Sequence, residues 1–230
     1  SVYHRGEELS ASGGFQMELT SYAQLHYSNM AEWTVTERAD NGCTARGRML
    51  RLPVELLWKM WVDEAGRLFW DIARACERET QIEHIATLLG FPTAYLRWMY
   101  GDFAGEFPEI LPSDTRWSLV VAQENKLRET ALLPEDGSPL PPVFSRVEAA
   151  NPHYGFILFN SEYVRFNRML MASASYPQHD CLFRPGRNEL MRVELDPART
   201  AEELQSMIRA PRMLECGPLT VRFENGSLRL

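Results

Sequence analysis

Four residues in the second half of the chain have the side chains that catalytic and metal sites use. They are His153, His179, Asp180 and Cys181. A cysteine near a histidine could form a nucleophile–base pair, and the same groups could ligate a zinc ion. Because adjacent residues on one loop rarely converge on a point, we predict no catalytic residue and no metal ligand here. An uncharacterised hydrolase or nuclease using this region stays open as an alternative.

The common catalytic and nucleotide-binding motifs are absent from the sequence. It contains no P-loop, no GxGxxG, no HExxH and no GxSxG. We therefore predict no cofactor and favour a non-enzymatic protein.

Basic residues cluster on a predicted β-hairpin that turns at Asp40–Gly42. Arg46, Arg48 and Arg51 follow the turn, and Arg38 lies on the facing strand. Such a cluster could contact phosphate groups beside a DNA-binding helix. The other interpretation is an edge strand that charge keeps soluble.

Residues 80–100 have the pattern of a helix-turn-helix, TQIEHIATLLGFPTAYLRWMY. Apolar residues recur at helical spacing on both sides of Gly90, and Pro92 suits the first position of a second helix. Leu96 would lock the two helices together. The residues presented to duplex DNA would be Thr93, Ala94, Arg97 and Trp98. The alternative is that this element is purely structural and that the protein is an adaptor or a subunit of an assembly.

The segment that follows carries a family resemblance. A loop, AGEFPEILPSDTRW, comes next and then a predicted helix that contains Asn125. This order resembles FlhC, the DNA-binding subunit of the bacterial flagellar master regulator, and the matching positions are Leu111, Pro112 and Trp117. The resemblance covers about residues 80–131. It implies a transcriptional regulator that works in a protein complex.

The composition of the chain narrows the cellular compartment and the classes of binding partner that we expect. The chain has 230 residues and 45% hydrophobic residues, enough to bury a sizeable core. A net charge of −7 argues against a general polyanion binder but leaves room for a local basic patch. The polar first residues predict no secretory signal, and no apolar run is long enough to span a bilayer. The four isolated cysteines are typical of a cytoplasmic protein.

Hydrophobic periodicity divides the chain into four parts. Residues 1–14 are predicted to be a flexible tail, and residues 15–131 a β-hairpin followed by a helical helix-turn-helix domain. Residues 132–153 contain five prolines and are expected to form a linker or long loop. Residues 154–230 are predicted to be mixed α and β, with a capping box at Thr200–Glu203 and a second hairpin near the C-terminus.

The longest predicted helix runs from Pro53 to about Arg78, because apolar residues recur there at steps of three and four. Further helices are expected near residues 114–131 and 156–173. The predicted fold class is therefore α+β, with a helical centre containing a helix-turn-helix and β-hairpins near both termini. The predicted function is a bacterial nucleic-acid-associated regulator or subunit. Its expected partners are duplex DNA or a nucleoprotein complex, together with a protein partner or a second copy of the chain.

Overall fold

The structure is a computed structural model. It describes residues 1–11, 14–101, 103–109, 118–120, 128–151, 154–161, 167–175, 182–197, 200, 202–204, 212–216, 219–224 and 227–229. Within these ranges helix is confined to a 3-10 turn at Ser28–Met30, to residue 128 and to residues 202–204, and most other residues are in strands. The predicted α+β class with a helical centre is therefore wrong.

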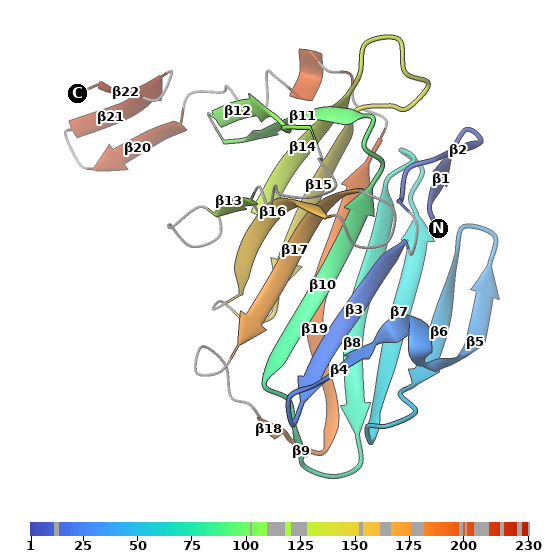
Figure 1. The fold of residues 1–230 in the computed structure, drawn as a ribbon. Helices are drawn as coiled ribbons and strands as arrows, with labels where there is room; N and C mark the ends of the chain where they lie inside the picture. Colours follow the sequence, from blue (N-terminus) through green and yellow to red (C-terminus); the bar gives the residue numbers. More distant parts are fainter. Residues whose placement is uncertain are drawn as a thin grey trace.

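Two antiparallel sheets lie face to face and form a β-sandwich (Figure 1). In order across the first sheet, its six strands are β13 (Ser118–Val120), β16 (Gly155–Ser161), β17 (Asn167–Ser175), β10 (His84–Phe91), β3 (Phe15–Ser21) and β4 (Gln24–Tyr27). The nine strands of the second sheet are β12 (Phe103–Glu106), β11 (Tyr95–Tyr100), β14 (Glu129–Pro134), β15 (Val143–Ala149), β19 (Gly186–Asp196), β8 (Leu68–Cys76), β7 (Val54–Val62), β6 (Gly42–Arg48) and β5 (Glu32–Ala39).

Three small sheets complete the described structure. They are formed by β1 (Tyr3–His4) with β2 (Glu7–Glu8), by β9 (Thr80–Gln81) with β18 (Leu182–Phe183), and by β20 (Arg212–Cys216), β21 (Leu219–Glu224) and β22 (Ser227–Arg229). Strands from both sides of residues 132–153 occur in each of the two large sheets. The domain boundaries inferred from the sequence stay a prediction.

A chain of aromatic contacts joins the two large sheets. Successive rings along it have centroids 4.1–6.2 Å apart, in the order Trp33, Trp58, Trp70, Phe15, Phe91, Tyr95. The contact between Trp70 of β8 and Phe15 of β3 crosses from one sheet to the other. Aromatic pairs of this kind add about 0.5–1.5 kcal/mol each beyond the burial of their area.

The predicted helix from Pro53 to Arg78 is instead the hairpin of β7 and β8. Asp63 closes the turn, since its Oδ1 accepts hydrogen bonds from the N–H groups of Ala65 and Arg67 at 3.0 and 2.9 Å. Gly66 has φ +82°, a conformation that glycine adopts without strain. The helix prediction failed because both faces of these strands carry apolar side chains, so steps of three and four could be selected from a period-two pattern.

The predicted helix-turn-helix at residues 80–100 is also wrong, because these residues form β9, β10 and β11. Ile85 and Leu89 of β10 face the core, while Ala86, on the opposite face of the strand, is buried as well. A strand buried on both faces has a continuous apolar sequence, which periodicity alone cannot distinguish from a buried helix. Leu96, expected to lock two helices, is 37% exposed.

Some local predictions are confirmed. The hairpin near Asp40–Gly42 is formed by β5 and β6. The C-terminal hairpin is formed by β21 and β22, with Glu224 opposite Ser227. In the capping box, Thr200 N–H donates to Glu203 Oε2 at 2.8 Å, and Glu203 N–H donates to Thr200 Oγ1 at 3.2 Å. The helix expected at 156–173 is wrong, since β16 and β17 occupy most of that range.

We expect the fold to require glycine at position 42 because neighbouring atoms leave no space for a Cβ, and not because of the backbone conformation there. A Cβ added there would lie 2.8 Å from Cβ of Trp61 and would collide with the carbonyl of Met60. We expect Gly42→Ala to lower the free energy of unfolding by about 1–3 kcal/mol, as overpacking does elsewhere. Urea denaturation measures this change.

Gly155→Ala is the matched control. An added Cβ at this strand position would meet only the carbonyl oxygen of Ser173, at 3.8 Å, an ordinary contact. We expect no loss of stability there. Equal losses in the two variants would contradict the steric explanation for Gly42.

Candidate functional site

The residues predicted to bind DNA do not form one surface. In the nine-stranded sheet β11 is the second strand and β6 the eighth, so Arg97 and Arg46 lie six strand positions apart, about 29 Å. Trp98, on β11 like Arg97, alternates to the opposite face and packs against the core. Thr93 and Ala94 lie in the turn between β10 and β11, and Arg51 lies in the bend before β7.

Three of the predicted phosphate-binding cations are paired with carboxylates. Arg46 lies 3.6 Å from Glu55, Arg97 lies 3.0 Å from Asp136, and Arg48 pairs with Glu32. The predicted function of DNA binding through a helix-turn-helix is wrong, because residues 80–100 form strands and no helix-turn-helix is present there. The FlhC resemblance stays a prediction; the first two helices it assumed are strands, and Leu111, Pro112 and Trp117 lie outside the described residues.

The suspected catalytic and metal-binding residues cannot be placed. His153, His179, Asp180 and Cys181 all lie outside the described residues. In the part of the chain that is described, no cluster of three or more His, Cys, Asp or Glu could hold a metal ion. His84 is half-buried on β10, with its Nδ1 2.7 Å from Ser175 Oγ.

The clearest candidate site lies on the outer face of the nine-stranded sheet, the face that points away from the six-stranded sheet. Side chains alternate along each strand, so the register assigns a definite set of residues to this face. One row across the sheet carries mainly charged and polar groups: Glu37, Thr44, Lys59, Asp71, Arg192 and Glu148.

A β-bulge in β19 enriches this face in charge. The register shifts between Glu189 and Met191, so Glu189 lies opposite Ala73 while Met191 lies opposite Ile72. An extra residue at a bulge reverses the alternation beyond it. Glu189 before the bulge and Arg192 after it therefore both reach the outer face, although they are three positions apart in the sequence.

A shallow concavity of about 770 Å³ lies over these rows. Leu57 and Ala73 provide an apolar floor, because they lie opposite each other on β7 and β8. Four cations and four carboxylates also line it: Arg46, Lys59, Arg187, Arg192, Glu37, Asp71, Glu148 and Glu189. Its volume falls in the range of about 300–1,000 Å³ that small-molecule sites occupy.

Arg192 and Asp71 form a bidentate ion pair in the concavity. Arg192 donates from Nε to Asp71 Oδ1 at 2.6 Å and from an Nη to Oδ2 at 2.9 Å, a bidentate arrangement that fixes both side chains. The hydrogen bond to Asp71 raises the pKa of the Arg192 guanidinium above its ordinary value. For Lys59, by contrast, no described carboxylate lies within ion-pair distance.

An aromatic pair borders the concavity. Trp61 and Phe69 are opposite each other on β7 and β8, with ring centroids 5.1 Å apart and ring planes 12° apart. Lys59 Nζ lies 5.2 Å and Arg192 Cζ lies 5.4 Å from the centroid of the Trp61 ring. Both rings are half-buried, so part of each remains accessible from the outer face.

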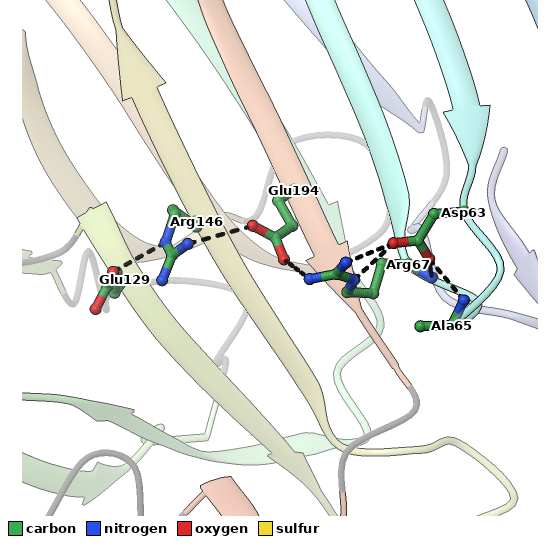
Figure 2. A network of polar contacts seen from close by, with 6 residues as sticks. All are labelled: Asp63, Ala65, Arg67, Glu129, Arg146 and Glu194. Atoms are coloured by element: carbon green, nitrogen blue, oxygen red, sulfur yellow. Dashed lines mark hydrogen bonds and ion pairs between the residues drawn. The ribbon is translucent and has the colours of Figure 1, made fainter. Parts of the chain in front are cut away.

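Beyond the aromatic pair, five charged residues form a continuous network (Figure 2). Arg67 lies 2.6 Å from Asp63 and 3.4 Å from Glu194, and Arg146 lies 3.6 Å from Glu194 and 2.9 Å from Glu129. Hydrogen bonds from the backbone and side chain of Arg67 hold the pKa of Asp63 below its ordinary value. Glu194, with a side chain only 10% exposed, is the centre of the network.

The fold class is a two-layer β-sandwich, and comparison with known proteins finds similar solved structures. No protein-family model and no curated protein matches the chain. Among solved structures it is similar to a GalM/aldose epimerase homologue from C. elegans, with 10% identity and a TM-score of 0.53 over 83% of this chain and 80% of that chain. At this identity the similarity shows the fold alone.

Two further solved structures have lower scores. The GH36 alpha-galactosidase AgaB from Geobacillus stearothermophilus has a TM-score of 0.45 and 9% identity, over 84% of this chain and 30% of that one. A mutant of the heparan sulfate lyase HepC from Pedobacter heparinus also has a TM-score of 0.45 and 9% identity, over 92% of this chain and 29% of that one. As for membranes, none of the described helical segments has the length and apolar character of a membrane-spanning helix.

Removing the charge of Glu194 should destabilise the protein. Glu194→Gln keeps the shape of the side chain but leaves Arg67 and Arg146 facing a neutral amide. We expect the free energy of unfolding to fall by about 1–3 kcal/mol at low salt, the range for losing a hydrogen-bonded charged group. Urea denaturation at low and high salt measures the loss, which should be smaller at high salt.

Glu129→Gln is the control at the exposed end of the same network. Its partner Arg146 keeps Glu194, and the Glu129 side chain is 46% exposed, so the loss should stay below about 1 kcal/mol. If the two variants lost the same stability, Glu194 would not be the centre of the network.

Proposed function

We propose that this protein binds a carbohydrate in the concavity on the outer face of the nine-stranded sheet. The observation that carries the proposal is the alternation of carboxylates and cations around the apolar floor of Leu57 and Ala73. A sugar ring has the complementary surface, since its C–H groups are apolar and each hydroxyl both donates and accepts hydrogen bonds.

Each type of group in the concavity has a partner on such a ligand. Carboxylates such as Glu148 and Glu189 accept hydrogen bonds from hydroxyl groups, and Lys59 and Arg187 donate to hydroxyl oxygens. The bidentate pair of Arg192 and Asp71 holds a donor and an acceptor side by side before a ligand arrives. Preorganised groups of this kind lower the entropy lost on binding.

The similarity of fold supports the same proposal. The C. elegans structure is described as an aldose epimerase homologue, and an aldose is a sugar. A protein partner or a second copy of the chain, and a cytoplasmic location, stay predictions from the sequence.

Lys59→Met should weaken sugar binding without changing the fold. The variant keeps most of the apolar stem and removes an exposed ammonium group that faces the concavity. We expect the affinity to fall about tenfold or more, because a hydrogen bond to a charged group contributes about 1.5–3 kcal/mol. Titration followed by NMR, with D-glucose, D-galactose, D-mannose and D-glucuronate as probes, measures the affinity.

Arg38→Met is the matched control, because Arg38 is an exposed cation on β5 that does not line the concavity. It should bind each sugar as the wild type does, and both variants should keep the wild-type melting temperature. Failure of the wild type to bind any sugar would refute the proposal. Unchanged binding by Lys59→Met would place the sugar elsewhere.

A further inference from the structure

We infer that the ligand is an oligosaccharide chain and that Trp61 and Phe69 form a second sugar-binding position beside the concavity. This inference rests on the proposed function and deepens it. It concerns the length of the ligand, whereas the proposed function requires only that one sugar binds.

The two positions are continuous along the strands. Trp61 follows Lys59 by two residues on β7, and Phe69 precedes Asp71 by two residues on β8. Residues two apart on a strand point to the same face and lie about 7 Å from each other. No other outer-face residue of these two strands lies between the concavity and the aromatic pair.

One flank of the aromatic pair has no side chain from the neighbouring strand. The residue opposite Trp61 on β6 is Gly42, which leaves the side of Trp61 toward β6 without a cross-strand side chain. Lys59 and Arg192 lie over the ring, and both also line the concavity. The same two cations can therefore donate hydrogen bonds to a sugar in either position.

The second position also has polar groups of its own. Arg67 Cζ lies 5.5 Å from the centroid of the Phe69 ring, and its guanidinium is held by Asp63 and Glu194 (Figure 2). The aromatic pair is thus bordered by hydrogen-bonding groups both toward the concavity and away from it. An apolar surface between two polar borders suits a second sugar ring linked to the first.

The dependence of affinity on chain length tests this inference. The probes are α-1,4-linked glucose, β-1,4-linked glucose and α-1,4-linked galacturonate, each from one to six units. In the wild type we expect the affinity for at least one series to rise about five- to tenfold from one unit to two, and then to level off.

Trp61→Leu keeps an apolar side chain but removes the aromatic surface. It should abolish the rise with chain length, so that the longer probes bind no more tightly than the single sugar does to the same variant. Phe69→Leu should reduce the rise, which provides a second readout if Trp61→Leu fails to fold. Tyr3→Leu, at an aromatic residue 63% exposed in the β1–β2 hairpin, should keep the full rise.

The outcomes separate the inference from the proposed function. Binding of single sugars with no rise in the wild type would overturn the inference and leave the proposed function intact. A full rise in folded Trp61→Leu and Phe69→Leu would also overturn it. If no probe of any length bound the wild type, the proposed function itself would fail.

Discussion

The contact between Trp70 and Phe15 fixes the relation between the two sheets, and much else depends on it. Because Trp70 must face inward, alternation turns its neighbours on β8, Phe69 and Asp71, toward the outer face. A slip of one residue would exchange the two sets and would bury Asp71 while exposing a tryptophan that is 3% exposed. The inner aromatic contacts therefore determine which groups a ligand meets outside.

Tryptophan and glycine oppose each other at several places in the nine-stranded sheet. Gly47 lies opposite Trp33 and Gly105 opposite Trp98, and an added Cβ at either glycine would collide with the indole ring. Large rings can lie over the backbone of the next strand only where no side chain occupies that position. On the outer face, Gly42 lies opposite Trp61, and there an added Cβ would collide with the Met60 carbonyl and with Cβ of Trp61 rather than with the indole ring.

The sequence predicted local structure wherever a few neighbouring residues determine it. The hairpin at Asp40–Gly42 and the capping box at Thr200–Glu203 depend on contacts within a few residues, and both are confirmed. Strands such as β10 were misassigned because burial on both faces removes the period-two signal. Propensity and spacing could not reveal that the nearest partners of this strand come from β3 and β17.

The candidate site could not be predicted from local sequence patterns, because its residues are far apart in the chain. Arg192 and Asp71 are 121 residues apart in the sequence, and Arg67 and Glu194 are 127 apart. Lys59, a cation between Trp58 and Met60, gave no signal either, because it fits the polar side of the predicted helix as well as the exposed face of a strand. The bulge in β19 likewise gives no sequence signal, yet it places both Glu189 and Arg192 on the outer face.

The pairing of charges on the outer face favours a hydroxylated ligand over a polyanion. A phosphate backbone would have to compete with Asp71 for Arg192 and with Glu194 for Arg67, and the remaining carboxylates would repel it. A sugar hydroxyl can donate to Asp71 and accept from Lys59 without separating any existing pair. Since a single neutral hydrogen bond contributes only about 0.5–1.5 kcal/mol, useful affinity requires several such contacts together with apolar contact. A face on which an apolar floor and an aromatic pair lie among paired charges meets both requirements along the length of a sugar chain.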